Sequence, residues 1–159
     1  MNTENKVGGL PEETVCLRLI DPSEFKQGPC EDEEVLSRVR KAFRSADHHE
    51  NSAGVEFGSP RSGSGNFAVY DLTGNYSYSG MIDSLSSDPE ELICGKEVTH
   101  FLANNLERLR GTVHFLLDLD SVASVSLGSD NSLRVEVHYL DCDNLWLGFY
   151  GRSFIVPQS

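Results

Sequence analysis

Apolar and polar residues alternate most regularly in the last third of the chain, from Gly111 to Val156. Four alternating segments can be read there: Thr112–Leu117, Val122–Leu127, Ser132–Leu140 and Leu145–Val156. Two of the intervening stretches, Gly128–Asn131 and Asp141–Asn144, are rich in Gly, Asp and Asn, which suit tight turns. The third segment has an apolar face and a polar face, the period-two pattern of a half-buried strand. The pattern predicts an antiparallel meander.

The apolar face of the third segment is expected to line the core. That face carries Leu133, Val135, Val137 and Tyr139, and the opposite face carries Arg134, Glu136 and His138. We expect a helix upstream of the meander to pack against the apolar face through Phe101, Leu102 and Leu106.

Four further elements are predicted before the meander. They are a strand at Thr14–Ile20, a helix at Glu31–Arg44, a hairpin with arms Asn66–Leu72 and Asn75–Ser79, and a second helix that starts at Asp88-Pro89 and stops at Gly111. The first helix has one apolar stripe, acidic residues in its first turn and basic residues in its later half, an order that suits the helix dipole. Gly95 makes a break in the second helix plausible.

These elements predict an α+β fold, in which an antiparallel sheet packs against two amphipathic helices. The sheet would combine the C-terminal meander, the central hairpin and the N-terminal strand. Residues 1–13 are expected to form a flexible leader, and 14–159 a single domain. Within that domain, the Gly/Ser-rich stretch near 45–66 is expected to be a mobile loop rather than a phosphate-binding loop.

The net charge of −12 is the most unusual bulk property. Acidic residues exceed basic ones by four in each of the ranges 1–50, 51–110 and 111–159, so the charge is not confined to a tail. Such a field disfavours nucleic acid and anionic membranes and favours a basic protein partner. The alternative interpretation is that the acidity only keeps the protein soluble. No apolar stretch resembles a signal peptide or a membrane span, and the four cysteines form no Cys-x-x-Cys pair. We expect a cytoplasmic protein with reduced cysteines.

Two chemical sites are considered and set aside. His48-His49-Glu50 lacks the spacing of a metal-binding motif, and nothing in the spacing of His100, His114 and His138 requires them to complete a site. Cys94 and His100 would point about 120° apart on one helix, which argues against a nucleophile and base pair. No catalytic residue, metal or cofactor is therefore predicted, and whether the protein is an enzyme stays open, with the balance against it.

Paired aspartates and aromatic residues supply the candidate binding site. Asp118 and Asp120 follow the first predicted meander strand, and Asp141 and Asp143 follow the third. In a meander these two turns share one edge of the sheet, so four carboxylates could gather on one rim. Calcium is not predicted, because the sequence from Asp118 lacks the glycine and glutamate of an EF-hand loop. Trp146 and Tyr150, in a stretch apolar on both faces, either are buried or add aromatic contact area to the same surface.

The favoured hypothesis is a small acidic cytoplasmic binding protein. Its concrete version is an inhibitor or immunity protein that neutralises a basic, nuclease-type toxin or enzyme. Small acidic α+β proteins of this general character occur among bacterial immunity proteins and antitoxin-like inhibitors, but no motif here matches one of them. The alternatives are a small hydrolase or metal-dependent enzyme with a site assembled from scattered His, Asp and Cys residues, and a structural subunit of a larger assembly. The oligomeric state is left open.

Overall fold

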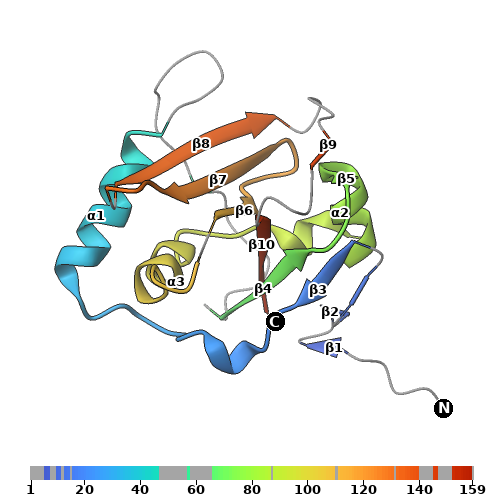
Figure 1. Cartoon of the computed structure of the whole chain (residues 1–159), viewed down its shortest axis with the longest axis horizontal. Coiled ribbons are helices and arrows are strands. Elements are labelled where there is room, and N and C mark those ends of the chain that lie inside the picture. The colour runs from blue at the N-terminus through green and yellow to red at the C-terminus, as the bar shows by residue number, and fades with distance from the viewer. Residues whose placement is uncertain are drawn as a thin grey trace.

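Among the residues that the structure describes, six strands form one mixed, open sheet in the order β3-β4-β10-β6-β7-β8 (Figure 1). The computed structural model describes residues 6–7, 10–11, 13–14, 16–46, 57, 66–86, 88–109, 111–130, 132–139, 145–146 and 152–158. The six strands are β3 (Leu17–Leu19), β4 (Phe67–Leu72), β10 (Arg152–Pro157), β6 (Thr112–Leu116), β7 (Ser121–Leu127) and β8 (Leu133–Tyr139). Two small pairs stand apart from the sheet: β1 (Lys6–Val7) with β2 (Leu10–Pro11), and β5 (Tyr76–Ser77) with β9 (Leu145–Trp146).

Three strands of the predicted meander are confirmed. β6 pairs antiparallel with β7, and β7 pairs antiparallel with β8 along its whole length, from Ser121 opposite Tyr139 to Leu127 opposite Leu133. β8 is the last strand of the sheet. β6 and β8 therefore run in the same direction, and their C-terminal ends lie at the same end of the sheet.

The prediction of a fourth meander strand is wrong, and so is the prediction of a purely antiparallel sheet. Leu145–Val156 is not one strand beside β8. Leu145–Trp146 pairs with β5, and Arg152–Pro157 returns to the middle of the sheet, parallel to β6 and antiparallel to β4. The last strand suits this central place because Phe154, Ile155 and Val156 are buried on alternating faces, as in a strand covered on both sides.

The prediction of a central hairpin is also wrong. β4 pairs with β3 and β10 rather than with the residues that follow it. After the two-residue β5, the chain enters helix α2 (Tyr78–Leu85), whose N-cap Ser77 accepts a hydrogen bond from the Gly80 backbone N–H through its Oγ (3.2 Å). The N-cap favours a helix at this point, although the spacing of Tyr76 and Tyr78 matches a strand pattern.

The first predicted helix is confirmed as α1 (Glu33–Arg44), and the second is broken at the place where Gly95 lies. Asp88 caps a 3₁₀ turn, η2 (Pro89–Leu92), and helix α3 covers only Val98–Asn104. Between them the Cys94 N–H donates to the Leu116 carbonyl at the end of β6 (2.9 Å), which holds the chain extended. A further 3₁₀ turn, η1, spans Pro22–Glu24. No helix in the described ranges is both long and apolar enough to cross a membrane.

Helices cover both faces of the sheet. α1 and α3 pack on one face, over buried residues of β4, β6, β7, β8 and β10. α2 and η2 pack on the other face, over residues of β3, β4, β6, β7 and β10. The prediction of two helices on one face is confirmed for α1 and α3 only, because η2, predicted as the start of the second helix, packs on the other face. The helix α2 on that second face was not predicted. The protein is an α+β protein with a mixed sheet between two helical layers.

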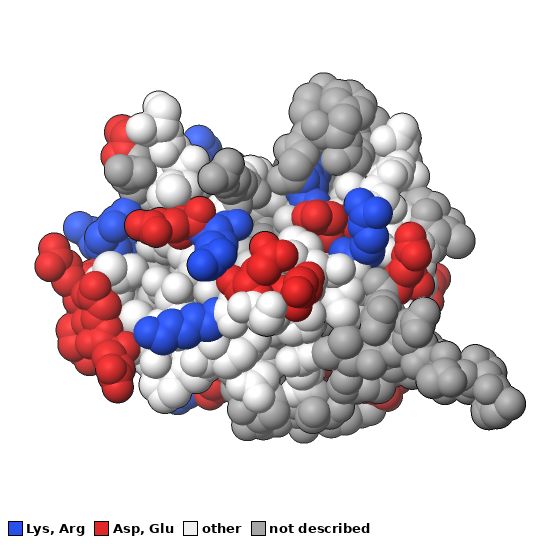
Figure 2. All heavy atoms as spheres, turned by 60° about the horizontal axis from the view of Figure 1, so that its bottom comes forward, with Lys and Arg blue, Asp and Glu red and all other residues white. Residues whose placement is uncertain are grey.

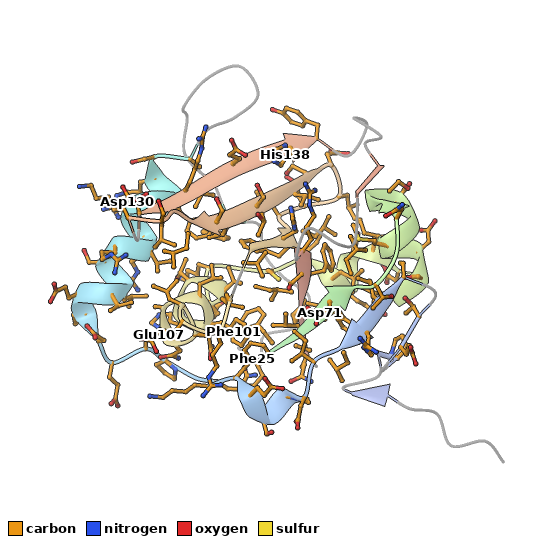
Figure 3. The ribbon with its side chains drawn as sticks, in the orientation of Figure 1. Phe25, Asp71, Phe101, Glu107, Asp130 and His138 are labelled. Atoms are coloured by element: carbon orange, nitrogen blue, oxygen red, sulfur yellow. The ribbon has the colours of Figure 1, made fainter. Side chains whose placement is uncertain are left out.

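The predicted core face of β8 is confirmed for two of its four residues. Val135 and Val137 are buried, and Leu133 is partly buried. Tyr139 is 45% exposed, because it lies at the end of the outermost strand, so its assignment to the core is wrong. On the facing helix layer Phe101 and Leu102 are buried and Leu106 is partly buried. Phe101 packs against Phe25 with ring centroids 5.7 Å apart (Figure 3).

Candidate functional site

The turn between β6 and β7 holds the first two of the predicted rim aspartates. The Oδ1 of Asp118 accepts hydrogen bonds from the Asp120 backbone N–H (2.8 Å) and from the Ser121 hydroxyl (3.0 Å). The Leu117 N–H donates to the Ser121 carbonyl (2.9 Å) and closes the turn. Asp118 therefore stabilises the turn. The Asp120 carboxylate accepts no hydrogen bond from any described residue and is exposed.

An exposed leucine lies between these two carboxylates. Leu119 is 49% exposed, and Tyr139, which pairs with Ser121 across the ladder, is 45% exposed. These are two of the three large hydrophobic side chains that are exposed within the described ranges. We call Asp118, Leu119, Asp120 and Tyr139 the sheet-edge patch. The patch combines apolar contact area with carboxylates, a composition that suits a protein–protein interface.

The structure tests only part of the remaining predicted site. Asp141, Asp143 and Tyr150 lie outside the described residues. Trp146 is placed by its backbone in β9, opposite Tyr76, next to α2 rather than in the main sheet. The common rim of four aspartates therefore stays a prediction, of which the structure places Asp118 and Asp120.

A second acidic group lies at the start of α1. Glu31, Asp32, Glu33 and Glu34 are all exposed, and Figure 2 shows acidic side chains gathered at the edge of the molecule on which α1 lies. The Oδ1 of Asp32 accepts hydrogen bonds from the backbone N–H groups of Glu34 and Val35, at 3.2 Å each. This group serves the N-terminus of the helix, where negative charge is stabilising.

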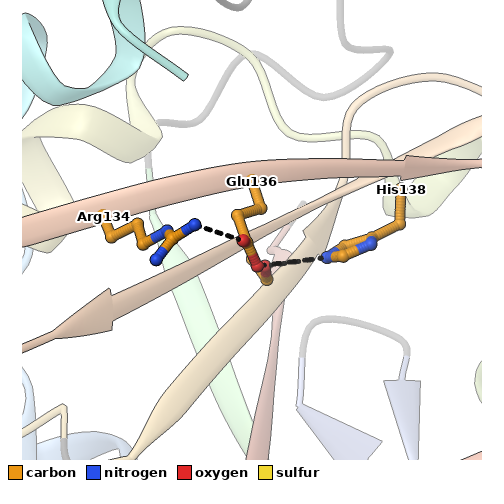
Figure 4. A network of polar contacts seen from close by, with 4 residues as sticks. Arg134, Glu136 and His138 are labelled. Atoms are coloured by element: carbon orange, nitrogen blue, oxygen red, sulfur yellow. Dashed lines mark hydrogen bonds and ion pairs between the residues drawn. The ribbon is translucent and has the colours of Figure 1, made fainter. Parts of the chain in front are cut away.

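The outer face of β7 and β8 carries a polar row that resembles catalytic machinery at first sight (Figure 4). Arg134 forms an ion pair with Glu136 (3.3 Å), and Glu136 Oε1 lies 3.9 Å from His138 Nε2. The same Nε2 lies 3.1 Å from the buried Ser124 hydroxyl. A serine–histidine–acid relay needs the acid on the ring nitrogen opposite the serine. In this arrangement both partners share one nitrogen, so the row is not such a relay.

Three other chemically reactive side chains, His114, Cys94 and His100, form no hydrogen bond with one another. His114 is buried, and burial, together with the charges of Arg152 and His138, holds its pKa well below the usual value, against the opposing effect of its hydrogen bond to the Ser153 carbonyl (3.4 Å). Burial raises the pKa of the Cys94 thiol, so it stays protonated. His100 accepts a hydrogen bond from the Cys30 backbone N–H at Nδ1 (2.9 Å) and makes no contact of this kind with Cys94.

Metal-binding geometry is absent from the part of the chain that the structure describes. No three His, Cys, Asp or Glu side chains converge there. His48, His49 and Glu50 lie outside the described residues. The three described histidines each have a different partner: Cys30 for His100, Ser153 for His114 and Ser124 for His138.

Sequence reasoning missed the two apolar members of the sheet-edge patch. The signal for Leu119 was present, because an apolar residue between two aspartates in a turn has nowhere to be buried. Nothing in the sequence indicates that Tyr139 is exposed, since its exposure depends on β8 being the end strand.

Searches of protein families, of curated proteins and of solved structures find no match to this chain.

Proposed function

We propose that this protein is a small acidic binding protein that attaches to a basic protein partner through the sheet-edge patch. Its concrete form is an inhibitor or immunity protein that neutralises a basic enzyme or nuclease-type toxin. The observation that carries the proposal is the position of Leu119, which is exposed between two aspartates and two residues before Ser121, the ladder partner of the exposed Tyr139.

The patch has the parts that a recognition surface needs. Tyrosine is enriched among the residues that dominate binding energy, because it buries a large area at a small entropic cost. Leu119 adds apolar area, and the turn that holds it is fixed by the Asp118 hydrogen bonds, so little order is lost on binding. Asp120 remains available to a cation on the partner.

The charge of the whole chain favours a basic partner. A net charge of −12 accelerates the encounter with a positively charged protein and repels nucleic acid. Enzymes that act on phosphodiesters carry cationic groups for their substrate, and carboxylates on an inhibitor can occupy those groups. This reasoning is why a nuclease-type target is the preferred class.

The first test is capture of a partner from an extract of the source organism. Three immobilised baits are compared: the native protein, the double variant Leu119→Ser/Tyr139→Ser, and the control Leu127→Ser, which alters the third exposed hydrophobic residue at the opposite end of β7. We expect a basic protein to bind the native and control baits and to be lost from the double variant, with affinity reduced about tenfold or more. Equal recovery on all three baits would exclude the patch as the interface.

The second test measures association rates with the purified partner. Asp118→Asn/Asp120→Asn removes two charges from the patch and keeps an oxygen at residue 118 for the turn. Glu33→Gln/Glu34→Gln removes two charges from the start of α1 and keeps the Asp32 cap. The patch variant should associate several-fold more slowly, and the difference should shrink as salt is raised from about 20 mM to about 300 mM. A larger effect of the α1 variant would place the interface on α1.

A further inference from the structure

A cavity of about 280 Å³ lies between α1 and the start of α3, away from the sheet-edge patch. α1 contributes Arg40, Phe43 and Arg44 to its lining. The segment that leads into α3 contributes Lys96, and α3 itself contributes His100. Two elements that are distant in sequence therefore bring basic side chains to one hollow.

The lining of this α1–α3 pocket is basic on a strongly acidic chain. It contains three permanent cations, Arg40, Arg44 and Lys96, and one acid, Glu97, whereas the chain as a whole carries −12. Within the described residues, none of these three cations forms a hydrogen bond or ion pair through its side chain. The dipole of α1 accounts for basic residues in its last turn, but not for Lys96, which belongs to a different element. Three cations that have no partner among the described residues, gathered around one hollow, favour a dianion.

The same pocket has an apolar wall and a fixed hydrogen-bond donor. The rings of Phe43 and Phe57 are 5.3 Å apart, and Phe57 is half-buried, so an apolar surface faces the hollow. The Nδ1 of His100 accepts a hydrogen bond from Cys30 N–H, which leaves the proton of the neutral ring on Nε2. The Thr99 hydroxyl donates to the Lys96 carbonyl (2.7 Å) and fixes the backbone at Lys96.

We propose that the α1–α3 pocket binds a small organic phosphate monoester. The two guanidinium groups and the Lys96 ammonium hold the phosphate dianion, since the planar fork of arginine matches phosphate geometry. The His100 ring supplies a further N–H donor. The apolar or aromatic body of the ligand packs on the Phe57 ring. This binding site is independent of the sheet-edge patch and of the partner proposed for it.

Phenyl phosphate, inorganic phosphate and benzoate are the three probes for this site. Each is titrated into isotopically labelled protein at constant ionic strength and about pH 8, where the phosphate ester is a dianion. We expect saturable binding of phenyl phosphate, with shifts of the amide signals of residues 40–44 and 96–100. Inorganic phosphate lacks the apolar body and benzoate lacks the second charge, so both should bind more weakly. No saturable binding of phenyl phosphate, or equal affinity for either other probe, would overturn the proposal.

Matched variants separate contact from general charge. Arg40→Gln, Arg44→Gln and Lys96→Gln should each weaken binding of phenyl phosphate about tenfold. Lys41→Gln removes the same charge from the same helix outside the pocket and should change the affinity less than about twofold. If Lys41→Gln lost as much affinity for phenyl phosphate as the pocket variants, the net positive charge of the helix, and not contacts in the pocket, would account for binding. Leu119→Ser/Tyr139→Ser should bind phenyl phosphate like the native protein, so this test stands apart from that of the proposed function.

Discussion

The amide side chain of Asn105 shows how much one buried residue can hold together. Its Oδ1 accepts a hydrogen bond from the Lys26 backbone N–H (2.8 Å), and its Nδ2 donates to the carbonyls of Lys26 (3.0 Å) and Phe101 (2.7 Å). Asn105 is only 2% exposed. The segment after η1 is thereby fastened to the end of α3, beneath the Phe25–Phe101 ring contact.

Asn105→Ala should lower the free energy of unfolding by roughly 2–4 kcal/mol, because both backbone groups of Lys26 and the buried Phe101 carbonyl lose the hydrogen bonds of a buried amide. Its neighbour provides the control. Asn104 is half-buried and makes one such bond, from Nδ2 to the Gly28 carbonyl (3.0 Å), so Asn104→Ala should cost about 0.5–1.5 kcal/mol. Urea unfolding of both variants measures the difference. Equal losses would mean that the Lys26 backbone finds other partners.

At this scale the sequence predicts where polar residues lie but not what they contact. Asp118 and Asp120 are indistinguishable in the sequence, yet the first holds the turn and the second does not. Asn105 gives no signal at all, because its partner Lys26 is 79 residues away. The α1–α3 pocket could not be predicted from the sequence for the same reason, since Arg40 and Lys96 are far apart in the sequence and line one pocket only in the folded chain.

Secondary-structure elements follow the sequence where one face is buried and one is exposed. α1 and the edge strand β8 are elements of this kind, and periodicity finds them. Periodicity gives β10 the wrong bounds, as part of Leu145–Val156, and misses α2, whose eight residues begin with a local cap. Strand order cannot be read from periodicity either, and this is why the mixed sheet was not predicted.

The cap of α1 gives an element-scale prediction. Asp32→Ala removes the acceptor of two backbone N–H groups and should cost about 1 kcal/mol of unfolding free energy. Glu33→Ala removes the same charge one residue later without removing a cap, and should cost only a few tenths of a kcal/mol. Thermal or urea unfolding decides between them. If Glu33→Ala were the more harmful change, the charge and not the cap would set the stability of the helix start.

The two cores on either side of the sheet meet in β10. Ile155 belongs to the core under α1 and α3, whereas its neighbour Val156 belongs to the core under α2 and η2. Both side chains are fully buried. Because β10 also joins β4 to β6, it connects the two halves of the sheet as well as its two faces.

Ile155→Ala and Val156→Ala therefore test whether the molecule unfolds as one unit. Each should lower the unfolding free energy by roughly 2–4 kcal/mol, through lost burial and the cavity left behind. If residues 14–159 form the single domain predicted from the sequence, methyl signals from both cores should disappear at one urea concentration in each variant. Separate transitions for the two cores would divide the domain into two folding units.

The central place of β10 also has a consequence for synthesis on the ribosome. Residues 1–151 are made before it, so β4 and β6 leave the ribosome without the strand that each will flank. Until that strand arrives, both keep an open edge that can pair with another chain. During this interval the unpaired edges make the nascent chain prone to aggregation. Slow translation cannot help it to fold, because no pause before Arg152 supplies the missing strand.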